Sequence, residues 1–151
     1  MSESDQAAAE KTYRAIGRFI FEFSQVEYTI RDYLAQEIGL RDDHFAAVVQ
    51  SYDVALLCTV AKEVFGKSRA NTNGAAINDL IGKFLALNDE RNRLAHGLWV
   101  PFKDGGTVHY VSRGNLKPKM AANRAATLEK LADEACTLRF RLEKEFTSSG
   151  T

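Results

Sequence analysis

Several features that would assign a protein to a membrane, secreted or repetitive class are missing from this chain of 151 residues. No apolar run approaches the roughly 20 residues of a membrane-spanning helix, so we expect no membrane association. Residues 1–6 are polar and acidic and do not resemble a signal peptide. Neither an internal repeat nor a low-complexity block occurs, which predicts a single domain over residues 1–151.

Cysteine is scarce, and no pattern of metal ligands is present. Cys58 and Cys136 each lie inside a helical pattern and do not form a metal-ligand pair, so we interpret both as reduced, buried thiols of a cytoplasmic protein. Asp42, Asp43 and His44 are adjacent, but consecutive helical residues diverge by about 100° and do not converge on one ion. Acids there favour the dipole of a new helix instead. The sequence predicts no metal and no other cofactor.

The charge balance is zero overall but uneven along the chain. Between residues 91 and 124 seven basic residues face the single acid Asp104, a net charge of +6 that leaves −6 for the remainder. The seven are Arg91, Arg93, Lys103, Arg113, Lys117, Lys119 and Arg124. This reversal favours an anionic ligand or, equally, a solvated basic loop. For a bound substrate we expect contacts from Arg93, Lys103, Arg113 and Lys117.

The first part of the chain predicts one long amphipathic helix, from Asp5 to Ile38, which Gly39 ends. Apolar residues recur on it every three or four positions. They are Tyr13, Ile16, Phe19, Ile20, Phe23, Val26, Ile30 and Leu34. Glu27 lies on the same stripe, where an unpaired carboxylate is costly to bury. It either pairs with an arginine or reaches water at the edge of the stripe.

Two further helical segments follow. Asp42 opens the first, and Ser51 or Asp53 caps the next. Its core stripe, ending at Gly66, consists of Leu56, Leu57, Val60, Val64 and Phe65. A polar linker over residues 67–74 is too short to separate domains and leads into another helix.

After residue 97 the pattern changes to a β-hairpin. Leu98–Phe102 and Thr107–Val111 are rich in β-branched and aromatic residues and flank an Asp-Gly-Gly turn. Pro101 suits an edge strand, where its missing N–H costs no hydrogen bond. Trp99 and Tyr110 can stack on bases or pack the hairpin on the helices, and we favour packing, with His109 a polar strand residue.

The last helix is predicted to start at Pro118 and to run to Phe146. Its apolar stripe consists of Ala122, Ala125, Leu128, Leu131, Ala135, Leu138, Leu142 and Phe146. We expect residues 1–5 and 147–151 to be disordered. The predicted fold is therefore all-α, an antiparallel up-down bundle with a β-hairpin inserted before the last long helix.

Chemistry is concentrated at the end of the helix that starts near Ile77. Its apolar stripe stops where Arg91, Asn92, Arg93 and His96 follow. Gly97 is expected to end the helix in the left-handed conformation that glycine adopts without a steric penalty. Arginine and histidine near a helix C-terminus also have a purely structural explanation, because both interact favourably with the helix dipole.

This segment resembles a known family. Arg91-Asn92-Arg93-Leu94-Ala95-His96 matches the R-x4-H motif of the HEPN superfamily (higher eukaryotes and prokaryotes nucleotide-binding), and residues 23–34 are similar to the first long helix of compact HEPN domains. The resemblance implies a metal-independent endoribonuclease that acts as a homodimer with a shared active site and leaves a 2′,3′-cyclic phosphate. It also implies a non-catalytic alternative, a HEPN module that binds a nucleotide, RNA or a protein partner.

The residue types suit that reaction. His96 can take the 2′-OH proton or protonate the leaving oxygen, and Arg91 can hold a phosphate oxygen. Asn92 can hydrogen-bond His96 or the substrate. Residues five apart on a helix point about 140° away from each other, so two motif helices meeting across a two-fold axis would complete one site.

Family members of this kind include toxins of toxin–antitoxin and phage-defence systems, which implies an antitoxin or defence partner. Some of those toxins carry a tyrosine two residues after the motif histidine, where an antitoxin modifies it. Leu98 occupies that position here, so neutralisation by modification is not expected for this chain.

Overall fold

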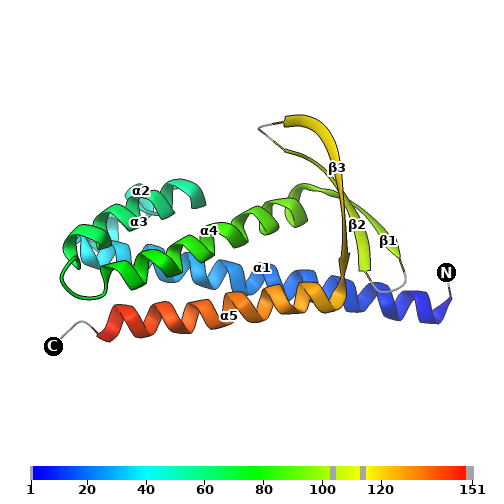
Figure 1. Cartoon of the computed structure of the whole chain (residues 1–151), viewed down its shortest axis with the longest axis horizontal. Coiled ribbons are helices and arrows are strands. Elements are labelled where there is room, and N and C mark those ends of the chain that lie inside the picture. The colour runs from blue at the N-terminus through cyan, green and yellow to red at the C-terminus, as the bar shows by residue number, and fades with distance from the viewer. Residues whose placement is uncertain (1, 103–104, 113–114, 149–151) are drawn as a thin grey trace.

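The computed structural model describes residues 2–102, 105–112 and 115–148, and it is mostly helical (Figure 1). Within these residues the helices are α1 (Glu3–Glu37), α2 (Asp42–Val48), α3 (Val54–Ser68), α4 (Gly74–His96) and α5 (Ala125–Ser148). Between α4 and α5 lie the strands β1 (Leu98–Phe102), β2 (Gly105–Ser112) and β3 (Asn115–Arg124). A helical chain with a small antiparallel sheet before the last helix is confirmed. No described helix has the length and apolar character needed to cross a membrane.

Helices α1 and α5 both extend beyond their predicted ends. Ser2 caps α1, since its hydroxyl accepts a hydrogen bond from the Asp5 amide at 3.3 Å and the Asp5 carboxylate accepts one from the Ser2 amide at 3.0 Å. Helix α1 therefore begins at Glu3 and not at Asp5, because a capping box satisfies the first-turn amides. Helix α5 continues to Ser148, while residues 149–151 lie outside the described residues.

Helix α1 buries most of the apolar stripe that the sequence predicted. Phe19, Phe23, Val26, Ile30 and Leu34 are buried, and Gly39 ends the helix at a φ of 68° as expected. The prediction is wrong at the edges of two stripes, where Tyr13 is 63% and Leu56 47% exposed. Periodicity identifies an apolar face, but the neighbouring helices determine which edge is covered.

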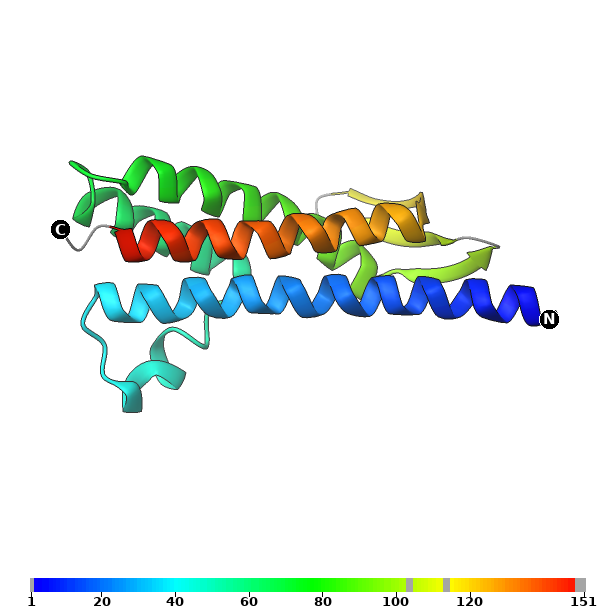
Figure 2. The same cartoon turned by 90° about the horizontal axis from the view of Figure 1, so that it is seen from below.

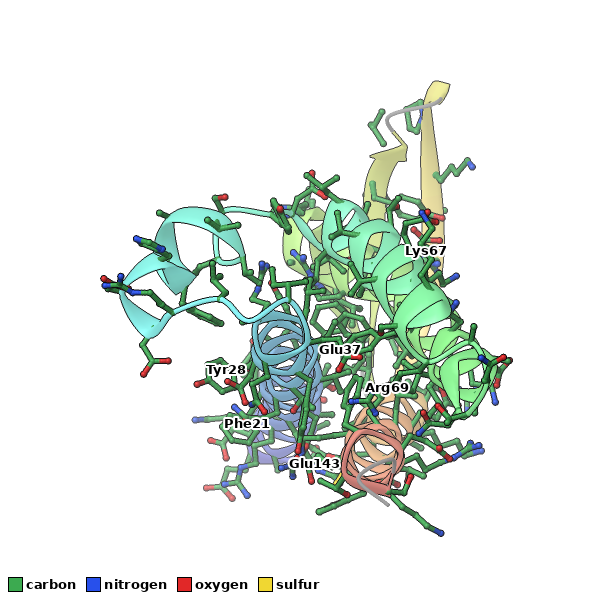
Figure 3. All side chains as sticks on the ribbon, turned by 90° about the vertical axis from the view of Figure 1, so that its left-hand side faces the viewer. Phe21, Tyr28, Glu37, Lys67, Arg69 and Glu143 are labelled. Carbon is green, nitrogen blue, oxygen red and sulfur yellow. The ribbon has the colours of Figure 1, made fainter. Side chains whose placement is uncertain are left out.

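One face of α1 points away from α5 (Figure 3), and at Tyr28 it meets the Phe45 ring of α2, with the ring centres 6.4 Å apart. Phe21 and Tyr28 point outward from it, away from α5 (Figure 3). Each is 60% exposed.

The helices are not antiparallel throughout, as the up-down prediction required. α1 and α5 lie side by side and run in the same direction (Figure 2). Ion pairs show this direction, because Arg18 contacts Glu129 near the start of α5 while Glu37 contacts Arg69, which bonds the Phe146 carbonyl near the end of α5. Residues 38–53 connect α1 to α3, and α3 runs in the same direction as α1 (Figure 1). Helix α4 runs in the opposite direction to α1, α3 and α5 (Figure 1).

The sheet has the order β1-β2-β3 and is antiparallel. The predicted hairpin is confirmed by pairing from Leu98 opposite His109 to Phe102 opposite Gly105, with Pro101 on an edge strand. The start of the last helix at Pro118 is wrong, since Pro118 lies in β3 opposite Val111. A proline is tolerated there because β3 is the other edge strand. The alanines of β3 favour a helix locally, and pairing with β2 outweighs that preference.

Two glycine-dependent features of α3 and α4 also differ from the prediction. Helix α3 continues through Gly66 to Ser68. Gly97 has a φ of −82°, not the left-handed value expected. Glycine is needed at position 97 because there is no room for a side chain. A Cβ there would lie 2.1 Å from a Val108 methyl carbon and 2.7 Å from the Arg93 carbonyl oxygen.

Candidate functional site

A pocket of about 910 Å³ lies where the C-terminal turns of α4, the first residues of α3 and the β2–β3 pair meet. Its walls contain Asp53, Val54, Ala55, Asn88, Asp89, Arg91, Asn92, Arg93, His96, Tyr110, Val111 and Lys119. All three residues predicted to be catalytic, Arg91, Asn92 and His96, therefore line one pocket. This size is within the range of about 300–1,000 Å³ that is usual for small-ligand sites.

The sheet is attached to the end of α4 at the floor of this region. The indole N–H of Trp99 donates a 3.0 Å hydrogen bond to the carbonyl oxygen of Leu94, one of the helix carbonyls that has no partner within the helix. The ring of Trp99 lies over Gly106, where a Cβ would be 2.7 Å from it. Packing of Trp99 within the sheet and on the helix end, favoured from the sequence, is confirmed.

The side chain of Arg91 is held in place on the inner side of the pocket. It is half-buried, its Cζ lies 5.2 Å from the centre of the Phe23 ring, and its Nη2 donates to Asn88 Oδ1 at 3.3 Å. Asn88 itself is only 8% exposed. Among the described residues Arg91 Nε is buried and has no hydrogen-bond partner. The half-buried guanidinium gives one N–H to Asn88, and an anionic oxygen in the pocket can approach the part of it that remains exposed.

Arg93 is arranged differently. Its Nη2 forms a 2.8 Å ion pair with Glu90, and its Cζ lies 5.2 Å from the centre of the Tyr110 ring. The Arg93 side chain is 24% exposed. Its charge is thus balanced within the protein, while its flat guanidinium remains part of the pocket wall.

Asn92 and His96 are the exposed members of the motif. Among the described residues no hydrogen bond joins His96 to Arg91 or Asn92, so the suggested Asn92–His96 contact is not observed. Residues five apart project in different directions. One chain therefore provides these groups in one pocket without bringing them into contact.

Three further residues were predicted to contact a substrate. Lys103 and Arg113 lie outside the described residues, and Lys117 belongs to β3. The structure adds Lys119, which pairs across the strands with Tyr110 and therefore shares its face of the sheet. In the sequence, Lys119 stood out only as one of the seven basic residues between positions 91 and 124. Its place in a strand was not expected, because the last helix was predicted to start at Pro118.

The wall contributed by α3 is fixed by a buried arginine on α1. Arg31, 8% exposed, donates to the Glu27 carboxylate, to the Val49 carbonyl oxygen and to the Tyr52 carbonyl oxygen at 2.7 Å. Glu27 therefore pairs with an arginine, one of the two alternatives left open by the sequence. Asp53, one of the two predicted caps, then caps α3 by accepting from the Leu56 amide at 2.8 Å, so Ser51 is not the cap.

Electrostatically the pocket is mixed. Arg91, Arg93 and Lys119 are its cations, and Asp53 and Asp89 are its carboxylates. Within the ranges that the structure describes, no three His, Cys, Asp or Glu side chains are grouped to hold a metal ion. This set can bind an anion, move a proton at His96 and present flat surfaces at Arg93 and Tyr110.

Comparisons with family models, curated proteins and solved structures found no match to this chain. The class that fold and pocket define is a mostly helical protein with a histidine-containing pocket of mixed charge at the end of a helix.

Proposed function

We propose that this protein is a metal-independent endoribonuclease of the HEPN type. The observation that carries the proposal is the convergence of Arg91, Asn92 and His96 of the R-x4-H motif on one pocket of about 910 Å³. The place of Arg91 in the pocket wall supports it, because a guanidinium there can hold a phosphate oxygen. In this proposal the protein acts on single-stranded RNA in the cytoplasm.

The reaction uses the RNA's own 2′-OH. The 2′-oxygen forms a bond to phosphorus while the bond from phosphorus to the 5′-oxygen breaks, which leaves a 2′,3′-cyclic phosphate and a 5′-OH. Arg91 stabilises the negative charge on the phosphate oxygens. His96 in its neutral form accepts the 2′-OH proton, and a protonated imidazole returns a proton to the leaving 5′-oxygen.

A homodimer would complete this proton balance. The pocket residues of one chain include a single histidine, His96, whereas the reaction needs a base and an acid. Arg91 and His96 also project from α4 about 140° apart. A second copy related by a two-fold axis would contribute its own His96 and Arg91 to the same phosphate.

The test is cleavage of a labelled single-stranded RNA in excess EDTA, with product ends analysed for cyclic phosphate. Wild type should cleave, and His96→Ala should lower the rate by about 10²–10⁴-fold. His44→Ala is the control, because His44 is exposed on α2 and is not part of the pocket. Cleavage that requires added Mg²⁺ or Mn²⁺, or equal rates for wild type and His96→Ala, contradicts the mechanism.

Sedimentation at micromolar concentration tests the dimer separately. Wild type should sediment as a dimer, and a strictly monomeric protein that still cleaves RNA would remove the shared site while leaving the ribonuclease proposal intact.

A second candidate is a non-catalytic HEPN module that binds a nucleotide, RNA or a protein partner. The observation that favours it is the state of the motif in one chain: Arg91 packs on Phe23 and bonds Asn88, and His96 has no orienting partner among the described residues. Expression of wild type and His96→Ala in cells separates the candidates. A toxin of a defence or toxin–antitoxin pair slows growth only as wild type, whereas equal growth with intact RNA supports the binding module.

A further inference from the structure

The two arginines of the motif segment have different environments, and this difference suggests different ligands. Arg91 keeps a buried Nε without a partner, while Arg93 has its charge balanced by Glu90 at 2.8 Å. A phosphate at Arg93 would meet a charge that this carboxylate already balances. What Arg93 offers instead is the plane of its guanidinium, which pairs with Glu90 and has its Cζ over the Tyr110 ring, 5.2 Å from the ring centre.

A flat guanidinium held in this way is a surface on which a nucleobase stacks. Proteins that bind unpaired RNA stack its bases on aromatic rings or on arginine planes. Arginine suits this use because it is planar and weakly hydrated. The Arg93 side chain is 24% exposed and lines the pocket, so a ligand there can reach the part of the guanidinium that the Tyr110 ring does not cover.

The position of Arg93 on α4 places its guanidinium plane where it would hold a base beside His96. Arg93 and His96 are three residues apart and share one face of α4, whereas Arg91 projects from nearly the opposite side. Lys119 lies directly across the strands from Tyr110 and also lines the pocket. Lys119 can therefore bind a phosphate that lies next to the stacked base.

We propose that Arg93, supported by Glu90 and Tyr110, forms a nucleobase-binding subsite of the pocket, with Lys119 binding the flanking phosphate. The inference rests on the proposed function for its place in catalysis, but it concerns binding and is measured without cleavage. It predicts that the pocket distinguishes a nucleotide from a sugar phosphate that lacks a base.

The probes are adenosine 5′-monophosphate and ribose 5-phosphate, titrated into the full-length protein and followed by NMR. Wild type should bind the nucleotide about tenfold more tightly than the sugar phosphate, as expected for one stacked base. Arg93→Lys keeps the charge and the pairing with Glu90 but loses the plane, so the ratio should fall to within about twofold of one. Lys119→Ala should weaken both probes alike and keep the ratio.

Two controls separate stacking from folding. Arg14→Lys changes an exposed arginine of α1 outside the pocket and should leave both affinities unchanged. Tyr110→Phe retains the ring and should keep the ratio, while Tyr110→Leu should lower it. Circular dichroism and thermal unfolding establish that each variant is folded.

Equal affinity of wild type for the two probes, or a full base preference in folded Arg93→Lys, overturns the subsite. Its failure is distinguishable from failure of the proposed function. RNA cleavage without base preference removes the subsite alone, whereas base preference that depends on Arg93 in a protein that does not cleave RNA supports the subsite and removes the ribonuclease.

Discussion

Trp99 donates its indole N–H to the carbonyl oxygen of Leu94 at 3.0 Å, and this bond joins the first strand to the last turn of the motif helix. Arg93 O, the preceding carbonyl, accepts from the Gly97 amide at 3.1 Å. The end of α4, which carries His96, is therefore fixed by the strand that follows it. Orientation of the motif depends on the sheet as well as on the helix.

Replacement of Trp99 by Phe should destabilise the protein by at least about 1 kcal/mol, because the Leu94 carbonyl loses its partner and the phenyl ring is smaller than the indole. Urea unfolding followed by circular dichroism measures this, since Trp99 is the single tryptophan of the chain and its fluorescence is lost in the variant. A variant as stable as wild type would show that water satisfies Leu94 equally well.

Gly97→Ala should destabilise the protein by about 1–3 kcal/mol, the usual cost of overpacking. The added Cβ would lie 2.1 Å from Val108 Cγ1 and 2.7 Å from the backbone oxygen of Arg93. Gly17→Ala is the matched control, because a Cβ at Gly17 in α1 meets nothing within 4 Å. That change should stabilise the protein by up to about 1 kcal/mol through helix propensity. Thermal unfolding of the two variants should therefore shift in opposite directions.

Glu37 and Arg69 join three helices at the end of the molecule remote from the sheet (Figure 3). Glu37 accepts from Arg69 at 2.9 and 3.1 Å, and Arg69 also donates to the Phe146 carbonyl oxygen at 3.2 Å. The side chains are only 17% and 15% exposed. Glu37→Gln should therefore cost about 2–3 kcal/mol at neutral pH, since it weakens a charge-assisted contact.

The same pair predicts a pH dependence. Arg69 lowers the pKa of the Glu37 carboxyl below its ordinary value of 4.5. A lowered folded pKa means that the stabilisation is present above about pH 4.5 and is lost as the pH falls through the folded pKa. The difference in unfolding free energy between wild type and Glu37→Gln should shrink from pH 5 to pH 3. Glu63→Gln, which removes an exposed pair with Lys67, should change stability little at any pH.

Cys58 should be inert in the folded protein. Burial raises the pKa of its thiol to about 11, and the thiolate is the reactive form. Iodoacetamide at pH 8 should leave Cys58 unmodified in the native state and modify it after unfolding in guanidinium chloride, as mass spectrometry of the peptides can show. Rapid native modification would mean that α3 opens readily.

Local patterns in the sequence were sufficient for α1, α3 and α4, for the hairpin and for the position of the motif, but not for the start of α5. Apolar spacing located α1 and α4, Asp53 is one of the two predicted caps of α3, and β1 pairs with β2 as the two predicted strands. Each depends on residues a few positions apart, so a short window contains the information. For the same reason the sequence placed Arg91, Asn92 and His96 at the end of one helix.

Other features were decided only by tertiary contacts between residues far apart in the sequence. Pairing with β2 made a strand of residues that favour a helix, and space beside Val108, not a left-handed turn, required Gly97. Tyr110 belongs to that sheet and lies 5.2 Å from the Cζ of Arg93, a contact that the sequence, which predicted Arg93 only as a substrate contact, did not show. These contacts depend on which residues are close in space, and the spacing of residues along the sequence carries no information about that.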